Sequence, residues 1–365
     1  MVFAPKAPVR IQPYFGHRSR NRLLLSARAL KSGKPQFENA GRLQAMRTML
    51  AQFASREAEG VEVRLEIDLA EGGKEVFTRV TDKEGFVHFD IELDPKLALP
   101  ERTMWDVVAL RWRNEDGEQC VEGHVLAPSE ATRLAVISDI DDTIIETGIT
   151  SGFRSIMKNW KRVLAQLPEE RIAVPGADAF YGALGGGAVL HEGEASAEKH
   201  VSATNRPFFY ISSSPWNLYS YLVAFQKVNN LPLGPLKLRD WGFNRETLGR
   251  KGHGAHKSAA IREILAMYPD IRFALIGDDT QGDLPAYGEA VREYPGRIAA
   301  IFLRKAASEA FNAEEETAKA MIEAAGVPIY IGECWEAGQK FLKATGFASD
   351  GETQKIVEAV DKATA

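Results

Sequence analysis

Cysteine is nearly absent from this sequence of 365 residues, which contains only Cys120 and Cys334. Two cysteines so far apart provide no disulfide framework, and they lack the paired spacing of a zinc site. We therefore expect a reducing, cytoplasmic location.

Long apolar runs and a strong excess of one charge are missing as well. No apolar run approaches 18 residues, so the sequence predicts no membrane-spanning helix. A formal net charge of -5 argues against a dedicated nucleic-acid binder. The N-terminal region is basic as far as Glu38 but has no apolar core of the secretory kind. A transit sequence would fit that composition, yet the strand-like run 22–28 favours folded protein.

The first third of the chain carries the pattern of short antiparallel strands. Apolar and polar residues alternate at 61–69 and 86–93, as in strands with one exposed face. Further strand patterns occur at 22–28, 76–80, 105–112 and 120–126, and residues 40–55 indicate a short helix. We predict a β-sandwich-like domain over residues 1–130, without a catalytic cluster.

Three arginines near the N-terminus, Arg18, Arg20 and Arg22, are spaced two residues apart. That period would place them on one face of a strand. They are either an anionic docking patch or a solvated edge strand protected by charge, and we favour the edge strand.

The pattern changes after a linker at 128–132. Apolar runs at 134–138, 207–211, 271–276, 298–303 and 327–331 alternate with helical segments, one of them from Glu314 to about Ala325. This alternation predicts an α/β fold with a doubly wound parallel sheet over residues 131–348. We expect residues 185–206 to form a mobile loop and residues 349–365 to form a loosely attached helical tail.

Three carboxylates follow the first of these runs, at Asp139, Asp141 and Asp142, and Thr143 comes next. Ligands bind at the carboxyl ends of strands in open α/β sheets. Crowded carboxylates repel one another, so we expect a cation to share the site, and Mg²⁺ suits such ligands. The alternative is an acidic turn, with at most a structural ion.

Hydroxyl groups follow the second run, at Ser212, Ser213 and Ser214. A helix is expected to begin with Ser214 as its N-cap and Pro215 in its first position, which would form a cradle for phosphate. The alternative is a simple capped helix.

Lys257 is predicted in the first turn of a later helix. A cation there opposes the helix dipole. A nearby phosphate and several carboxylates would explain its presence, whereas the alternative is a solvated surface lysine.

A second acidic cluster, Asp278, Asp279 and Asp283, follows the run 271–276. Two parallel strands that both end in paired aspartates place these carboxylates on the same edge of the sheet. Folding alone does not require that coincidence. Together with Ser212 and Lys257, it predicts a Mg²⁺-dependent phosphoryl-transfer site.

The order of these motifs resembles that of the haloacid-dehalogenase-like phosphatases, with Asp139-x-Asp141-x-Thr143 first and Gly277-Asp278-x-x-x-x-Asp283 last. The segments Tyr210-Ile-Ser-Ser-Ser-Pro-Trp-Asn and Leu233-Gly-Pro-Leu are similar to the catalytic domain of the actin-patch phosphatidate phosphatases and their bacterial relatives. The related lipins share a similar Leu-Pro-x-Gly-Pro segment.

The resemblance implies a role for each motif residue. Asp139 would be the nucleophile and Asp141 the acid and base, while Ser212 and Lys257 would bind phosphoryl oxygens. Mg²⁺ would be held by Asp139, the Asp141 carbonyl group and Asp278, with Asp279 or Asp283 in support. Whether Asp278 or Asp279 is the direct ligand stays open.

A stripe of apolar residues within 153–163 includes Trp160, and basic residues such as Arg154 and Lys158 form a second stripe. A basic amphipathic helix with a tryptophan at its boundary could meet a lipid surface. We favour the alternative, a cap helix that packs its apolar stripe on the domain.

These features together predict a Mg²⁺-dependent phosphomonoesterase with an aspartyl-phosphate intermediate. Phosphatidate, hydrolysed to diacylglycerol, is the expected substrate, and the protein would be cytoplasmic with peripheral membrane contact. The alternatives are a phosphatase of a soluble phosphate ester and a non-catalytic adaptor that keeps the fold. The intact acids at both strand ends argue against the adaptor.

Overall fold

The structure is a computed structural model, and the chain in it divides into two compact units, Met1–Glu130 and Ala131–Ala365. The segments expected as a helix at 40–55, an amphipathic helix at 153–163 and a tail at 349–365 lie outside the described residues. The structure describes residues 8–31, 56–68, 73–94, 96–141, 143, 177–186, 188–189, 203–239, 250–280, 282–307, 309–335, 338 and 340–342.

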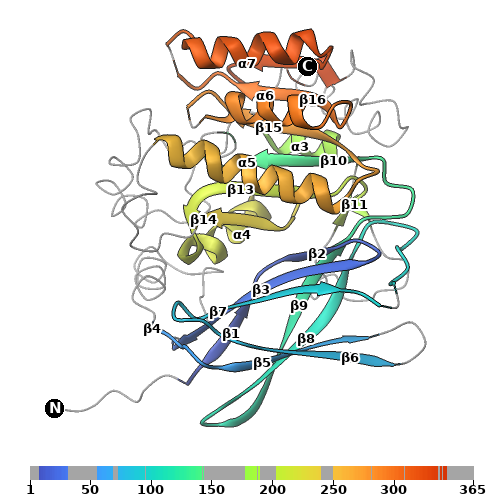
Figure 1. Ribbon diagram of the computed structural model, residues 1–365, viewed down its shortest axis with the longest axis vertical. Coiled ribbons are helices and arrows are strands. Elements are labelled where there is room, and N and C mark those ends of the chain that lie inside the picture. The colour runs from blue at the N-terminus through green and yellow to red at the C-terminus, as the bar shows by residue number, and fades with distance from the viewer. Residues whose placement is uncertain are drawn as a thin grey trace, which may run out of the picture. The chain divides into compact units, whose positions relative to one another are not determined.

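The first unit contains a mixed sheet of nine strands (Figure 1). Six of its strands coincide with predicted ones, whereas β1, β2 and β4 are only two to four residues long and left no periodic pattern. In sheet order the strands are β1 (Arg10–Pro13), β3 (Arg22–Lys31), β2 (Gly16–Arg18), β9 (Gly117–Ala127), β8 (Met104–Asn114), β5 (Glu62–Asp68) and β6 (Lys74–Val80), and both β4 (Arg56–Glu57) and β7 (Phe86–Glu92) pair with β3.

Alternating burial along these strands builds the core of the first unit. In β5, Val63, Leu65 and Ile67 are buried between exposed Glu62 and Asp68. The same core contains buried residues of β3, β7, β8 and β9, so strands from distant places in the sheet order enclose it. Hydrogen bonds join all nine strands because β2 pairs with both β3 and β9. A sandwich of two separate sheets is therefore not confirmed.

The three N-terminal arginines do not share one strand, so that prediction was wrong. Arg18 ends β2 and Arg22 begins the antiparallel β3, with a turn closed by the Ser19 amide on the Arg22 carbonyl at 2.9 Å. Each guanidinium is paired with a carboxylate, of Asp106, Glu130 and Asp90 respectively. Since β3 has neighbours on both sides, it is not an edge strand either.

The second unit is α/β, as expected, and is built on a sheet of six parallel strands. Numbered along the chain within this sheet, the strand order is 3-2-1-4-5-6, so the first strand, β10, lies where the order reverses. Open α/β sheets bind ligands at such a point, outside the carboxyl ends of the strands. In sheet order the strands are β14 (Leu236–Arg239), β13 (Phe208–Pro215), β10 (Leu134–Asp139), β15 (Arg272–Asp278), β16 (Ile298–Arg304) and β17 (Ile329–Gly332).

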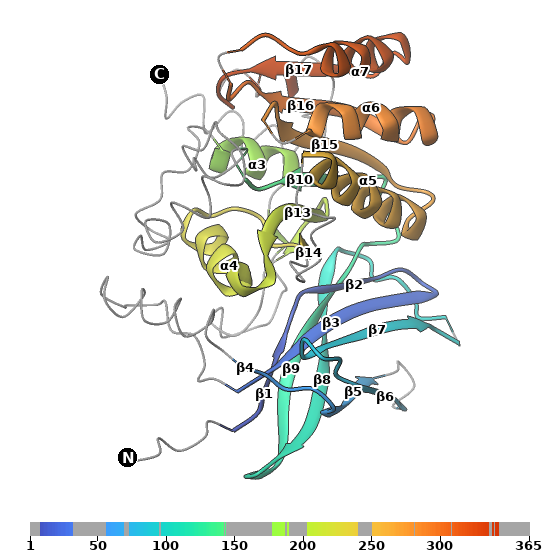
Figure 2. The same cartoon turned by 60° about the vertical axis from the view of Figure 1, so that its left-hand side comes forward.

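Helices cover both faces of this sheet (Figure 2). One face carries α3 (Ala177–Gly185) and α4 (Tyr219–Val228), and the other carries α5 (Arg250–Met267), α6 (Asp283–Glu293) and α7 (Ala313–Ala324). The central strands are buried along almost their whole length, which explains their continuous apolar runs. None of the helices in the described part of the chain has the length and hydropathy needed to cross a bilayer.

Two local predictions in this unit have clear outcomes. The helix expected at 314–325 is α7, which begins with a capping box between Asn312 and Glu315. The stretch 185–206 is not entirely a loop, because Ala188–Val189 (β11) and Ala203–Thr204 (β12) form a short antiparallel pair. Residues 190–202 lie outside the described residues.

Candidate active site

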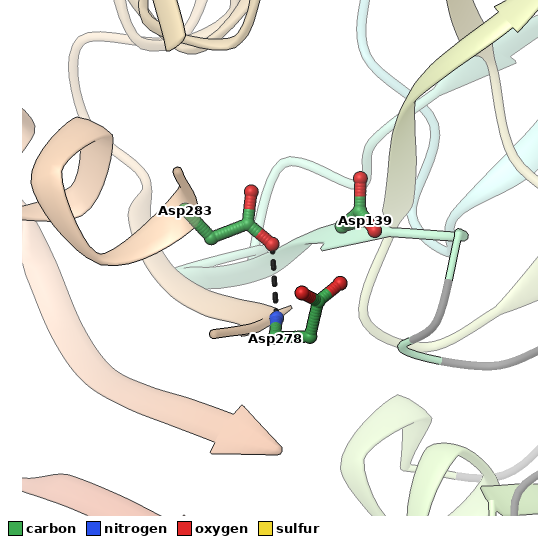
Figure 3. A group of neighbouring side chains, drawn as sticks. All are labelled: Asp139, Asp278 and Asp283. Atoms are coloured by element: carbon green, nitrogen blue, oxygen red, sulfur yellow. Dashed lines mark hydrogen bonds between the residues drawn. The ribbon is translucent and has the colours of Figure 1, made fainter. Parts of the chain in front are cut away.

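Three buried carboxyl groups converge at the carboxyl edge of the parallel sheet (Figure 3). Asp139 is the last residue of β10, Asp278 is the last of β15, and Asp283 is the first of α6. One oxygen from each lies within 4.8 Å of the others. Because β10 and β15 are adjacent and parallel, the sheet itself brings Asp139 and Asp278 together.

Lys257 is the buried cation of this cluster. Its Nζ lies 2.8 Å from Asp139 Oδ1 and also pairs with Asp283 Oδ1, and only 1% of the residue is exposed. The surface-lysine alternative is therefore wrong. Burial alone would lower the pKa of Lys257, but Asp139, Asp283 and Asp278 outweigh it and raise the pKa above its ordinary value, so the lysine stays charged.

The predicted position of Lys257 in its helix was also wrong. Because α5 begins at Arg250, Lys257 lies in its third turn. The extra helical residues before Lys257 include Gly252 and Gly254. A glycine inside a helix costs only about 1 kcal/mol, so the helix continues through both.

Backbone and hydroxyl donors hold the two aspartates of the second motif. Asp283 Oδ2 accepts a hydrogen bond from the Asp278 amide at 2.9 Å, drawn as a dashed line in Figure 3. The Asp278 carboxylate accepts from Thr143 Oγ1 at 3.3 Å and from Thr280 Oγ1 at 2.5 Å. Thr143, from the first motif, is thus directly connected to the second.

Asp141 has a separate set of donors from the end of β13. Its Oδ2 accepts from Ser212 Oγ at 2.6 Å and from the Ser213 amide at 3.1 Å, and its Oδ1 accepts from Ser214 Oγ at 3.0 Å. These donors fix the orientation of the carboxylate. In the structure, the Ser212 hydroxyl, which was expected to bind a phosphoryl oxygen, donates its hydrogen bond to the Asp141 carboxylate.

Ser214 does not cap a helix, so the predicted helix start was wrong. β13 continues to Pro215, whose φ of -72° and ψ of 154° are extended, and a 3₁₀ turn at Trp216–Leu218 precedes α4. The N-cap of α4 is Leu218. The Ser214 hydroxyl bonds to Asp141, and the Ser214 amide donates to Ser212 Oγ at 3.0 Å. The cradle of helix-start amides expected at Ser214 is not present.

Asp279 is turned away from the other acids. Its carboxylate accepts from Lys305 Nζ at 2.5 Å and from the amides of Ala306 and Ala307 at 2.7 and 2.9 Å. It therefore anchors the segment that follows β16. Of the two residues between which the sequence could not choose, the structure places Asp278 in the carboxylate cluster.

The charge and the donor set of the cluster fit a divalent cation. Three carboxylates opposed by one lysine leave two negative charges when all are ionised. Burial, with Asp283 adding to it, raises the pKa of Asp278 to about 7, and burial also raises the pKa of Asp139 well above its usual range. Among the described residues, Asp139 Oδ2 has no hydrogen-bond partner. Buried carboxylate oxygens with unsatisfied charge are the ligands that Mg²⁺ prefers.

Several contacts of the site were not predicted. Ser213 and Ser214 hold Asp141 beside Ser212. Three further buried side chains contribute: Ser138 bonds to the Tyr181 hydroxyl and to the Asp139 carbonyl, and Trp335 donates to the Thr143 carbonyl. Ser138 directly precedes Asp139, which is a signal that the sequence offered. Tyr181 and Trp335 are far from the motifs in sequence, and no local pattern marks them.

Gly277→Ala is expected to destabilise the fold by about 1–3 kcal/mol, the usual cost of overpacking. A Cβ at this position would clash with Asp283 Oδ2 and lie 2.5 Å from the Tyr287 hydroxyl. Denaturant unfolding of the full chain measures the effect. Gly182→Ala in α3 is the matched control, because a Cβ there meets nothing within 4 Å. An equal loss in both variants would contradict the steric argument.

The second unit is thus an α/β protein whose parallel sheet ends in a buried acidic cluster with a lysine at its centre. Residues 134–305 match the family described as "Phosphatidate phosphatase APP1, catalytic domain". This match confirms the resemblance to the APP1-like phosphatases that the motifs indicated.

Two fungal proteins illustrate the similarity. The chain is 29% identical over 171 residues to Phosphatidate phosphatase APP1 of Saccharomyces cerevisiae, an alignment covering 47% of this chain and 26% of that protein. It is 26% identical over 177 residues to an uncharacterised protein of Schizosaccharomyces pombe, covering 48% and 26%. The chain thus aligns with only about a quarter of the length of these relatives.

Solved structures add no argument about function. The alignment with a β-glucuronidase of Bacteroides uniformis covers 94% of this chain and 44% of the β-glucuronidase chain, but the sequence identity is 9% and the TM-score is 0.26. So low a score does not establish a common fold.

Proposed function

We propose that the second unit is a Mg²⁺-dependent phosphomonoesterase with a haloacid-dehalogenase-like, doubly wound fold. The strongest support is the arrangement of two separately held acids. Asp139 lies beside Lys257 in the buried cluster, and Asp141, close enough to influence the charge of Asp139, is fixed by the serines after β13. A nucleophile and a proton donor side by side are what a two-step phosphoryl transfer requires.

In the first step, an oxygen of Asp139 attacks the phosphorus atom while the bond from phosphorus to the ester oxygen breaks. Asp141 in its protonated form gives its proton to the departing alkoxide. Asp139 then carries the phosphoryl group as an aspartyl phosphate. Lys257 stays protonated and offsets negative charge beside the nucleophile throughout.

In the second step, Asp141 is an anion and takes a proton from the attacking water. The new bond between water oxygen and phosphorus forms as the acyl phosphate bond breaks, which frees Asp139 and inorganic phosphate. The donors from Ser212, Ser213 and Ser214 keep Asp141 in one orientation for both transfers. In this proposal, Ser212 positions Asp141 and reaches a phosphoryl oxygen only if its hydroxyl turns.

Asp139 and Asp278 are the proposed Mg²⁺ ligands, together with the Asp141 carbonyl group, and Asp283 supports them. The bound ion would offset the charge that develops on the phosphoryl oxygens and let an anionic nucleophile approach them. Asp279 is left out of this ligand set because its carboxylate is engaged with Lys305 and two amides.

The proposed substrate is phosphatidate, with diacylglycerol and inorganic phosphate as products. Its support is the match of residues 134–305 to a phosphatidate phosphatase catalytic domain. Hydrolysis of a phospholipid also requires peripheral contact with a lipid surface. A cytoplasmic location agrees with the scarcity of cysteine.

The purified chain is expected to release phosphate from phosphatidate in mixed micelles when Mg²⁺ is present and to stop when EDTA is added. Ca²⁺ should restore the activity poorly because its looser coordination does not hold the in-line geometry. A soluble aryl phosphate, assayed in parallel, distinguishes the substrate classes. If the chain hydrolysed the soluble ester rapidly but released no phosphate from the lipid, the proposal of phosphatidate as substrate would be wrong and a soluble phosphate ester would take its place. Full activity in EDTA would refute the metal-dependent mechanism.

A further inference from the structure

Trp335 reaches the active-site loops from a part of the chain that lies beyond the matched segment 134–305. It follows β17, and its side chain is completely buried. Its indole Nε1–H donates to the carbonyl oxygen of Thr143 at 3.0 Å, across 192 positions of sequence. Thr143 lies four residues after the proposed nucleophile, Asp139, which ends β10.

The contact continues from Thr143 into the acidic cluster. Thr143 Oγ1 donates to Asp278 Oδ2 at 3.3 Å, and both residues are completely buried. Trp335 therefore holds the backbone of a residue whose side chain holds a proposed Mg²⁺ ligand. At 3.3 Å this O–H···O bond is longer than the usual range of about 2.5–3.0 Å, so it is weak and a small movement of the Thr143 backbone would break it.

The indole itself is fixed by aromatic packing. Trp335 stacks on Phe180 of α3, with ring centroids 4.9 Å apart and an interplanar angle of 11°. The neighbouring residue, Tyr181, bonds to Ser138 Oγ at 2.7 Å, and Ser138 Oγ donates to the Asp139 carbonyl, also at 2.7 Å. One buried layer of α3 and Trp335 thus supports the loop on both sides of Asp141.

We infer that Trp335 is a positioning residue, which holds the Thr143 backbone so that the Thr143 hydroxyl can orient Asp278 for a divalent cation. This inference rests on the proposed function, because it concerns the same site. A structural tryptophan needs only some acceptor for its buried N–H. The acceptor used here belongs to Thr143, a described residue whose own side chain bonds to Asp278 of the cluster, and this link makes the inference testable.

Titration of the full chain with Mg²⁺ by isothermal calorimetry tests the inference without an activity assay. Trp335→Phe keeps an aromatic ring on Phe180 but removes the N–H donor, and it is expected to weaken Mg²⁺ binding about 10-fold, as loss of outer-shell support commonly does. Tyr330→Phe is the matched control. It removes a hydroxyl that donates to the Cys334 carbonyl at 2.7 Å in the same aromatic cluster, and it should leave Mg²⁺ affinity unchanged.

A double-mutant cycle with Thr143→Val tests whether Trp335 acts on Asp278 through Thr143. Thr143→Val alone should weaken Mg²⁺ binding by a similar factor, and adding Trp335→Phe to it should change the affinity less than twofold. Wild-type affinity in Trp335→Phe, or a full further loss in the double variant, would overturn the inference. If Trp335→Phe does not fold, the indole ¹⁵N–¹H signal of Trp335 in the wild type decides, since it must shift on Mg²⁺ addition. Absence of Mg²⁺ binding by the wild type would instead refute the proposed metal dependence.

Discussion

Asp139→Asn is expected to reduce phosphate release to below about 1% of the wild-type rate. An amide cannot form the acyl phosphate, so the two-step route is closed. The remaining groups, Asp141 and Lys257, keep their positions and cannot replace the nucleophile. Phosphate release from phosphatidate and from a soluble ester should fall together, because the loss concerns the shared chemical step.

The same substitution is expected to leave the free energy of unfolding unchanged or higher. Burial raises the pKa of Asp139, so its charged form is unfavourable in the folded chain. Asparagine removes one of three crowded carboxylates, and Lys257 keeps its pairing with Asp283. Urea unfolding in EDTA measures this effect.

Asp279→Asn is the matched control for Asp139→Asn. It changes the same chemical group at the same edge of the sheet, but its carboxylate anchors Lys305 and two backbone amides. We expect it to lower stability while activity stays within an order of magnitude. If Asp139→Asn kept more than a few per cent of activity, another residue would have to be the nucleophile.

The sheet of the second unit was largely predictable because its strands are buried on both faces. The runs at 134–138, 207–211, 271–276, 298–303 and 327–331 became five of the six strands. The sixth, β14, is only four residues long, which is too short to leave a recognisable apolar run. In the first unit, Arg18 and Arg22 illustrate a similar limit, since a tight turn within a regular period of two has no strong sequence signal.

The membership of the site was more predictable than its geometry. Parallel strands that end in Asp139 and Asp278 must meet at one edge, which is a consequence of sheet topology. Helix boundaries were not predictable in the same way. Ser214 bonds to Asp141 instead of capping a helix, and α5 begins at Arg250, well before Lys257. Trp335 contacts Thr143 across 192 positions, and only the folded chain could reveal that contact.

Lys257→Met is expected to destabilise the metal-free protein by about 3–5 kcal/mol near pH 8, because it leaves three buried carboxylates without their cation. Lys237→Met is the matched control. Lys237 pairs with Glu263 at 2.7 Å, but both side chains are partly exposed, so its loss should cost at most about 1 kcal/mol. Urea unfolding in EDTA compares the two variants.

The deficit of Lys257→Met should depend on pH with a definite sign. The pKa of Asp278 is about 7 in the folded chain, above the roughly 4 of an unfolded aspartate, and the pKa of Asp139 is also raised. The folded state therefore takes up protons as the pH falls through 7, and its stability rises relative to the unfolded state. Without Lys257 these pKa values rise further, so the variant gains more on acidification, and its deficit should be smaller at pH 5 than at pH 8.

Mg²⁺ should reduce the same deficit at pH 8, because a divalent cation bound by the carboxylates offsets the charge that Lys257 no longer offsets. The stabilisation should increase with Mg²⁺ concentration, as expected for a ligand that binds only the folded state. Lys237→Met should gain no more from Mg²⁺ than the wild type does. A deficit in Lys257→Met that changes with neither pH nor Mg²⁺ would mean that the lysine stabilises the fold by packing, and that the three carboxylates are not a charged cluster in need of a cation.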